Sequence, residues 1–321
     1  MKIGTGLYGC NGHQIQHLLE NHPRARLAAT ACIDLSSLPV SLRNDPGVRH
    51  YATLRELLAD PDVRLVSLCS PLRSDQAEDA IQCMLAGKDV YAEKPCALSE
   101  EELDAIIRTA RITGCRFREM AGTAFEQPYL SMRNLVRAGV IGEVVQVFAQ
   151  KSYPYFEQRP QDERIDGGLS RQAGVHAVRF VEHVAMQKVS EIAVVETQLG
   201  NPVSNGGLHM AASFMMSLAN GGVASAVVNY LNPQGFGRWG NEHLRIFGTS
   251  GFMEATDGGV RTRLIAGDRD LGEIDRSEPS QDYFDRYVDE LIGLAAMPYE
   301  PEEELHPTRM VIRAKSHSWF E

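Results

Sequence analysis

The chain has 321 residues, of which 43% are hydrophobic and 23% charged, a balance typical of a globular protein long enough for two domains. Its 42 acidic and 32 basic residues give a net charge of −10, which argues against nucleic acid or an anionic membrane as a partner. No apolar run reaches the roughly 18 residues of a membrane span, and the first residues are typical of a strand rather than a secretion signal. We therefore expect a cytoplasmic protein.

Strands and helices are predicted to alternate through the first 119 residues. Short apolar runs such as residues 25–34 are typical of buried parallel strands, and capping boxes begin helices after Thr53 and Ser99. Alternation of this kind predicts an α/β domain with a doubly wound parallel sheet of the Rossmann type. We assign residues 1–119 to this domain.

The pattern changes after about residue 120. One helix is followed by long segments of alternating polarity, and Asn-Gly-Gly at 220–222 and Asp-Gly-Gly at 257–259 indicate hairpin turns. We expect residues 120–321 to form an α+β domain with a large, mainly antiparallel sheet, which binds substrate and mediates oligomerisation.

A glycine-rich stretch near the N-terminus fits a dinucleotide-binding loop in two frames. Residues 4–9 match G-x-G-x-x-G letter for letter, but this frame leaves a strand of two residues and a helix interrupted by glycines. The second frame, with Gly9, Asn11 and Gly12, follows a full-length strand. We expect this second loop to bind the pyrophosphate of a dinucleotide, with Asn11 at the closest approach and His13 at the helix start.

Asp34 ends the second predicted strand, near the spacing from the loop that the dinucleotide motif requires. A carboxylate at this position accepts hydrogen bonds from the ribose 2′-hydroxyl and repels a 2′-phosphate. We therefore expect NAD as the cofactor. NADP is the alternative cofactor, because the neighbouring Ser36 and Ser37 weaken this preference.

Two further segments resemble the Gfo/Idh/MocA family, the glucose–fructose oxidoreductase and inositol 2-dehydrogenase group. The first has Ser-Pro at 70–71, Ala-Gly-Lys-Asp-Val at 86–90 and Glu-Lys-Pro at 93–95; the second is DGGLSRQAGVH at 166–176. The resemblance spans nearly the whole chain. It implies a dehydrogenase or reductase that transfers hydride between a nicotinamide and a hydroxyl or carbonyl carbon of a sugar, polyol or related compound.

The resemblance implies catalytic roles for Lys94 and His176. In the family the lysine lies beside nicotinamide and substrate, and the histidine exchanges the proton of the substrate hydroxyl. A histidine titrates near neutral pH, and a lysine ammonium stabilises a developing alkoxide. We expect Lys94 to contact the cofactor as well, together with Ser70, Pro71 and Glu93, and we expect Tyr153, Arg164, Gln172 and Arg179 to bind the substrate.

The chain departs from the family pattern around His176. Gln172 replaces an acidic residue four positions earlier, and Arg179 replaces another three positions later. A nearby arginine should make the histidine harder to protonate. Two alternatives stay open: an NAD-dependent glycoside-cleaving enzyme with transient oxidation, and a catalytically degenerate dinucleotide-binding protein. We expect no metal site at His176 and His183, which lie seven residues apart and share a helical face with Arg179, and we expect a homodimer or homotetramer.

Overall fold

The structure is a computed structural model that describes residues 2–316, and the described chain divides into two compact units. The first unit contains the residues up to Met120, Arg164–Gly167 and Phe284–Leu305, and the second contains Ala121–Glu163, Gly168–Tyr283 and the residues from His306 onward. A single division after residue 119 therefore does not describe the chain, because two later segments return to the first unit. We describe each unit by itself.

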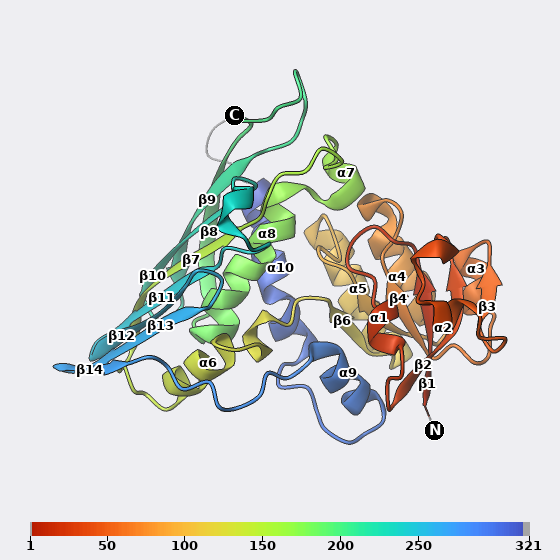
Figure 1. Ribbon diagram of the computed structural model, residues 1–321, viewed down its shortest axis with the longest axis horizontal. Helices are drawn as coiled ribbons and strands as arrows, with labels where there is room; N and C mark the ends of the chain where they lie inside the picture. The colour runs from red at the N-terminus through yellow and green to blue at the C-terminus, as the bar shows by residue number, and fades with distance from the viewer. Residues whose placement is uncertain (1, 317–321) are drawn as a thin grey trace. The chain divides into compact units, whose positions relative to one another are not determined.

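The first unit is built on a six-stranded sheet in which all neighbouring strands are parallel (Figure 1). The strand order is β3-β2-β1-β4-β5-β6, which reverses direction next to β1 as in a doubly wound fold. This confirms the predicted Rossmann-type sheet. The strands are β1 (Ile3–Tyr8), β2 (Ala25–Ala31), β3 (Arg49–Tyr51), β4 (Leu65–Leu68), β5 (Asp89–Ala92) and β6 (Phe117–Glu119).

Local signals determine where the helices of the first unit begin and end. The Thr53 and Ser99 side chains each accept a hydrogen bond from a backbone N–H three residues later, as the capping boxes predicted. Gly114, with φ of 72°, ends the longest of these helices. The helices are α1 (Gln16–Leu19), α2 (Val40–Arg43), α3 (Leu54–Leu58), α4 (Gln76–Leu85), α5 (Glu100–Thr113) and α9 (Tyr283–Leu291).

Helix α9 packs against the parallel sheet although it lies near the end of the chain. The Tyr287 hydroxyl lies 3.1 Å from the carbonyl oxygen of Val90 and 2.8 Å from that of Arg116, next to β5 and β6. Farther along the helix, the Arg118 guanidinium donates a hydrogen bond of 2.8 Å to Glu290. These buried contacts explain why residues 284–305 belong to the first unit.

The second unit contains an eight-stranded sheet of order β14-β13-β12-β11-β7-β10-β9-β8. Among the described strand pairs, β7 and β10 are parallel and the others are antiparallel. Both predicted hairpin turns are present, between β9 and β10 and between β12 and β13. The strands are β7 (Val144–Ser152), β8 (Val189–Thr197), β9 (Ala211–Leu218), β10 (Val223–Asn229), β11 (His243–Gly248), β12 (Gly251–Thr256), β13 (Arg261–Ala266) and β14 (Arg269–Gly272).

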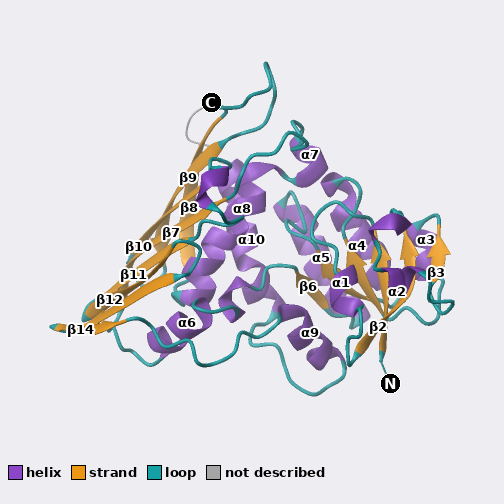
Figure 2. Cartoon of the chain, in the orientation of Figure 1, coloured by secondary structure: helices purple, strands orange, loops and turns teal. Residues whose placement is uncertain are grey.

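Helices cover one face of this sheet, and the described chain places no helix on the other face (Figures 1 and 2). The covering helices are α6 (Tyr129–Arg137), α8 (Gly168–Arg179) and the later part of α10 (Pro301–Ser316). Helix α8 continues into a π-helical turn, Phe180–Val184, and α7 (Glu163–Asp166) precedes it. Along β9, Phe214 and Met216 are buried while Met215 is 65% exposed, so the strand is amphipathic.

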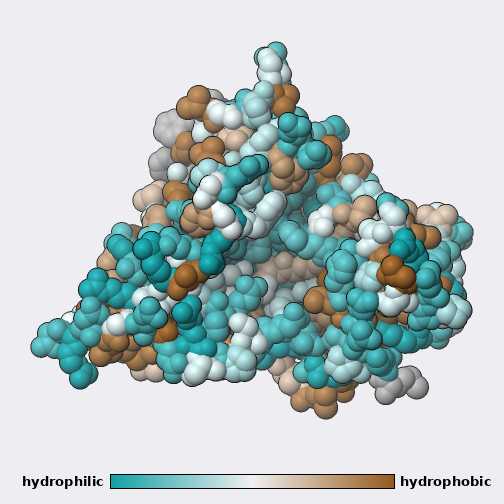
Figure 3. Space-filling view, in the orientation of Figure 1, coloured by the Kyte–Doolittle hydropathy of each residue, from teal (hydrophilic) through white to brown (hydrophobic). Residues whose placement is uncertain are grey.

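The surface in view in Figure 3 is mostly hydrophilic, with apolar side chains scattered singly or in small groups. Within residues 2–316, no helix combines the length and the hydropathy that crossing a membrane requires.

Candidate functional site

The predicted phosphate loop begins at Gly9, in the second of the two glycine frames. Strand β1 extends over Ile3–Tyr8, so Gly4 and Gly6 lie inside a strand. A Cβ atom at Gly4 would lie 1.8 Å from the carbonyl oxygen of Asp62, which explains this glycine by packing alone. Gly9 has φ of +69° and Gly12 has φ of +127°, backbone conformations that favour glycine.

Backbone N–H groups of the loop donate hydrogen bonds within the first unit. The N–H of Gly12 donates to the Cys10 carbonyl (3.0 Å), and the N–H of His13 donates to the Glu93 carboxylate (2.8 Å). The Gln14 side chain donates to the carbonyl oxygen of Gly9 (3.0 Å). These bonds hold the turn, and the helix that follows is a short one, α1.

Asn11 is held in the loop by its own side chain and by Arg73. Its amide nitrogen donates to the carbonyl oxygens of Pro71 (3.2 Å) and Ile165, and its carbonyl oxygen accepts a hydrogen bond of 2.6 Å from the Arg73 guanidinium. Arg73 is only 1% exposed. Sequence reasoning did not single out Arg73, although it lies two residues after the Ser-Pro signal.

Asp34 is exposed beyond the end of β2. Its carboxylate accepts hydrogen bonds from the hydroxyl (2.6 Å) and the backbone N–H (2.9 Å) of Ser36, which lower the pKa of Asp34. Ser70, by contrast, is fully buried, and its hydroxyl donates to Asp79 (2.7 Å). The Ser70 side chain is therefore engaged inside the first unit, whereas Pro71 is exposed.

Lys94 follows β5, and both it and Glu93 are buried, at 4% and 1% exposure. The Lys94 Nζ lies 3.5 Å from Glu93 Oε1, and the peptide bond to Pro95 is cis. Burial disfavours the charged form of Glu93, but Lys94 and His13 outweigh it and hold the pKa of Glu93 at about 2. For Lys94, burial is the largest influence and lowers the pKa, although Glu93 opposes it. The geometry therefore maintains a buried lysine–carboxylate pair.

His176 lies on α8 in the second unit, together with other residues expected at the site. It is 9% exposed, and its Nδ1 lies 3.3 Å from the Thr123 hydroxyl. Gln172, one turn earlier, is half-buried, whereas Arg179 is only 1% exposed. The substrate contact expected for Arg179 stays a prediction.

The remaining two expected substrate residues belong to different units. Arg164 is exposed and lies in the first unit. Tyr153, just after β7 in the second unit, lies with its ring centroid 6.1 Å from that of Trp239, and Phe156 lies 6.0 Å from Trp239. Trp239 is 55% exposed and Phe156 38% exposed, so the three rings form a partly exposed aromatic shelf.

One trio of potential metal ligands occurs within residues 2–316, away from the two histidines considered in the sequence. Side-chain atoms of Glu163, Glu196 and His209 lie within 4.8 Å of one another. The Lys315 ammonium, however, donates to Glu163 (2.9 Å) and to Glu196. A cation would have to compete with this ammonium for both carboxylates.

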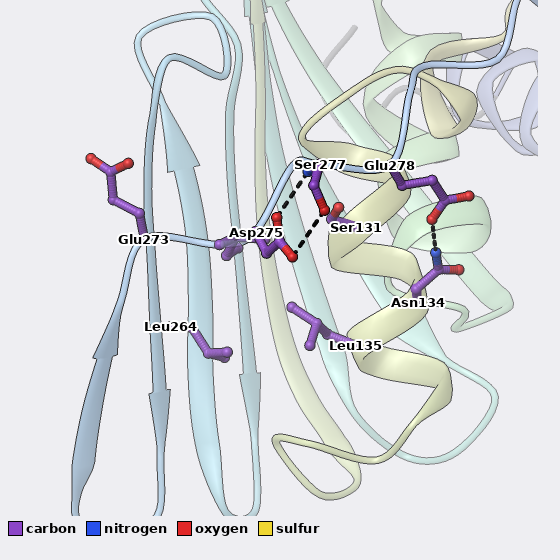
Figure 4. A pocket seen from close by; sticks show the side chains of 9 residues that line it. Ser131, Asn134, Leu135, Leu264, Glu273, Asp275, Ser277 and Glu278 are labelled. Carbon is purple, nitrogen blue, oxygen red and sulfur yellow. Dashed lines mark hydrogen bonds between the residues drawn. The ribbon is translucent and has the colours of Figure 1, made fainter.

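A cavity of about 530 Å³ lies in the second unit beside α6 (Figure 4). Leu135 and Leu264 contribute apolar side chains, and two of the carboxylates around it, Asp275 and Glu278, accept hydrogen bonds. Ser277 donates to Asp275, and Asn134 donates to Glu278 at 2.9 Å. None of the residues expected at the site lines this cavity.

Two segments of the chain, one in each half of the sequence, match known protein-family domains. Residues 3–120 match the oxidoreductase family with an NAD-binding Rossmann fold, and residues 129–254 match the GFO/IDH/MocA C-terminal domain. The chain belongs to the GFO/IDH/MocA family. The resemblance seen in the sequence is therefore confirmed, as is the fold class.

Individual relatives of this GFO/IDH/MocA member are distant. Trans-1,2-dihydrobenzene-1,2-diol dehydrogenase of Bos taurus is 26% identical over 216 residues, 63% of each chain. Inositol 2-dehydrogenase of Pseudomonas savastanoi pv. phaseolicola is 29% identical over 143 residues, 44% of this chain and 42% of that protein. These matches span less than two thirds of either relative. A solved Thermotoga maritima structure shares the fold, with a TM-score of 0.86 at 23% identity and 98% and 97% coverage.

Proposed function

We propose that the chain is an NAD(P)-dependent oxidoreductase that transfers hydride to or from a CH–OH carbon of a sugar, polyol or related hydroxyl compound. The observation that carries the proposal is the buried Lys94, which follows β5 in the same parallel sheet whose β1 leads into the loop at Gly9. Dinucleotides bind at the carboxyl ends of such strands. Membership of an oxidoreductase family supports this reading, as does the similarity to dehydrogenases named for a ring diol and for inositol.

The residues of the first unit fit a dinucleotide. A Cβ atom at Gly9 would lie 2.0 Å from the Cys69 carbonyl oxygen, and one at Gly12 would lie 2.5 Å from Glu93 Cγ, so the loop packs against the residues that follow β4 and β5, at the strand ends where dinucleotides bind. We propose that Gly9, Asn11, Gly12 and the exposed Asp34 hold the cofactor. NAD is the preferred form because Asp34 is ionised at neutral pH and would repel a 2′-phosphate. When bound, the nicotinamide supplies the hydride acceptor or donor.

Oxidation of a hydroxyl requires protein groups that accept the hydroxyl proton and stabilise the negative charge on the oxygen. We propose that His176 takes the proton of the substrate hydroxyl during oxidation, since an imidazole exchanges protons near neutral pH. Lys94 is proposed to stabilise the oxygen that becomes negative. The aromatic shelf offers flat apolar surfaces that suit the C–H face of a ring-shaped substrate, and Arg164 suits a substrate carboxylate.

The test is a panel of ring diols, inositols, aldoses and uronates, each incubated with NAD⁺ or NADP⁺ and followed by the absorbance of the reduced cofactor. The proposal predicts stoichiometric reduction with at least one compound. Lys94→Met should lower kcat at least 100-fold and leave NADH binding intact, because the ammonium acts on the reacting oxygen. Product without net NADH would support the glycoside-cleaving alternative, and binding without any turnover would support the degenerate one.

We further propose that a second copy of the chain covers the open face of the eight-stranded sheet. Val195, Met215 and Val223 are 48%, 65% and 48% exposed, and the strand register places them on one face, because Val195 is paired with Ser213 and Val223 with Ser217. Exposed apolar side chains on one sheet face favour association. Light scattering should give two or four times the mass of the chain, and Met215→Glu should lower it. A monomeric wild type would contradict the proposal.

A further inference from the structure

The segment Arg164–Gly167 lies against the phosphate loop and the Glu-Lys-Pro motif, although it is distant from both in sequence. The Asn11 amide donates a hydrogen bond to the carbonyl oxygen of Ile165. A Cβ atom at Gly167 would lie 2.6 Å from Pro95 Cγ and 3.6 Å from Arg73 Cγ. Ile165 and Gly167, on either side of Asp166, therefore contact the phosphate loop and the residue that follows Lys94.

Asp166 is consequently enclosed with three other charged side chains. It is 6% exposed, and Lys94, Arg73 and Glu93 are 4%, 1% and 1% exposed. The Lys94 ammonium lies 3.5 Å from Glu93 and within electrostatic reach of Asp166 and Arg73. We call these four residues the charge cluster; its two cations and two carboxylates balance.

The charge balance of the cluster depends on Asp166, because the other carboxylate, Glu93, also interacts with His13. Glu93 also accepts a hydrogen bond from the His13 backbone N–H, and the His13 ring nitrogen lies 3.3 Å from it. Within the charge cluster, loss of Asp166 would leave one carboxylate with two buried cations. Burial without a compensating opposite charge strongly disfavours the charged form of an ionisable group. Of the two cations, Lys94 can lose its proton, whereas the guanidinium of Arg73 cannot.

We propose that Asp166 is a positioning residue for Lys94: its carboxylate keeps the buried amine charged and directed beside Glu93 in the presence of Arg73. Asp166 acts through Lys94 and not on the substrate. The inference rests on the proposed catalytic role of Lys94 for its functional meaning. Its physical content, an electrostatic coupling between Asp166 and Lys94, needs neither cofactor nor substrate to be measured.

The first experiment measures the amine of Lys94 in the full chain. Trace acetic anhydride is applied over a range of pH, and acetylation of Lys94 is quantified by mass spectrometry. In Asp166→Asn, Lys94 should acetylate at least threefold faster at neutral pH than in the wild type, because more of it is the free amine. Asp166→Glu should restore the wild-type rate, and Asp162→Asn, four residues earlier, is the control. An unchanged pH dependence in folded Asp166→Asn would overturn the proposal.

A second experiment remains decisive where Asp166→Asn folds poorly. The melting temperatures of Lys94→Met, Asp166→Asn and the double variant form a thermodynamic cycle. If the two charges are coupled, Lys94→Met removes the uncompensated cation, and the double variant melts higher than Asp166→Asn alone. A double variant that is no more stable than Asp166→Asn would contradict the proposal. Failure of the substrate panel, by contrast, would leave both of these results unchanged and would reject only the proposed function.

Discussion

Gly167 packs its bare Cα against the ring of Pro95, so closely that a Cβ atom there would lie 2.6 Å from the proline Cγ. The contact joins a segment from the middle of the sequence to the residue that follows Lys94. Gly167 also has φ of +97°, so both its conformation and its surroundings require glycine.

Gly167→Ala should therefore displace the segment and weaken NADH binding at least tenfold, as measured by calorimetry. Gly87→Ala is the matched control, because Gly87 also has positive φ, +74°, but a Cβ atom added there would have no atom within 4 Å. The control should lose only about 1 kcal/mol of stability, from its backbone conformation, and keep its affinity. Equal effects in both variants would show that the contact with Pro95 is unimportant.

Cofactor preference should depend on Asp34. Replacing Asp34 with alanine removes the charge that repels a 2′-phosphate and the acceptor for the ribose hydroxyl. The ratio of NADPH to NADH affinity should rise at least tenfold, measured by fluorescence titration. Asp45→Ala, at another exposed aspartate of the same unit, should leave the ratio unchanged. An unchanged ratio in Asp34→Ala would place the ribose elsewhere.

Acid should destabilise the second unit through Glu163. Burial opposes the charge of Glu163, but hydrogen bonds from His209 and Lys315 hold its pKa at about 2, below the ordinary value of 4.5. Because the folded pKa is the lower one, the stabilisation is complete above about pH 4.5 and is lost as the pH falls toward 2. Glu163→Gln should lower the free energy of unfolding by about 1–2 kcal/mol at pH 7. Between pH 6 and pH 3, the melting temperature of the variant should fall less than that of the wild type. Parallel pH profiles for variant and wild type would contradict this assignment.

The aromatic shelf should affect substrate binding more than chemistry. For any ring substrate found in the panel, Trp239→Ala should raise KM about three- to tenfold and leave kcat nearly unchanged, because stacking is made before and during reaction alike. Leu199→Ala, at an apolar side chain that is 84% exposed, is the control. A fall in kcat without a change in KM would assign the ring another role.

The parts of the fold that could be predicted are those determined by residues close together in the sequence. The capping boxes at Thr53 and Ser99 and the hairpin turns combine signals only a few residues apart, so they are visible in a single stretch of sequence. The choice between the two glycine frames was similarly local, because β1 needs the residues up to Tyr8 to form a strand.

The parts that could not be predicted depend on contacts between distant segments. Nothing near residue 166 indicates that Asp166 is buried near Lys94, and nothing near residue 287 indicates that Tyr287 bonds to β5 and to the residue before β6. For the same reason the hydrogen bond from the Ser70 hydroxyl to Asp79 could not be predicted, and the expected contact of Ser70 with the cofactor stays a prediction. The near-complete burial of Arg179 likewise could not be predicted from the residues around it.

The most direct test of dinucleotide binding, on which the proposed function depends, is calorimetric titration of the purified chain with NADH. We predict saturable binding of one dinucleotide per chain, weakened at least tenfold in Gly9→Val, whose side chain would collide with the Cys69 carbonyl. Because every function considered for this chain begins with a bound dinucleotide, the absence of binding by NADH and by NADPH would contradict all of them.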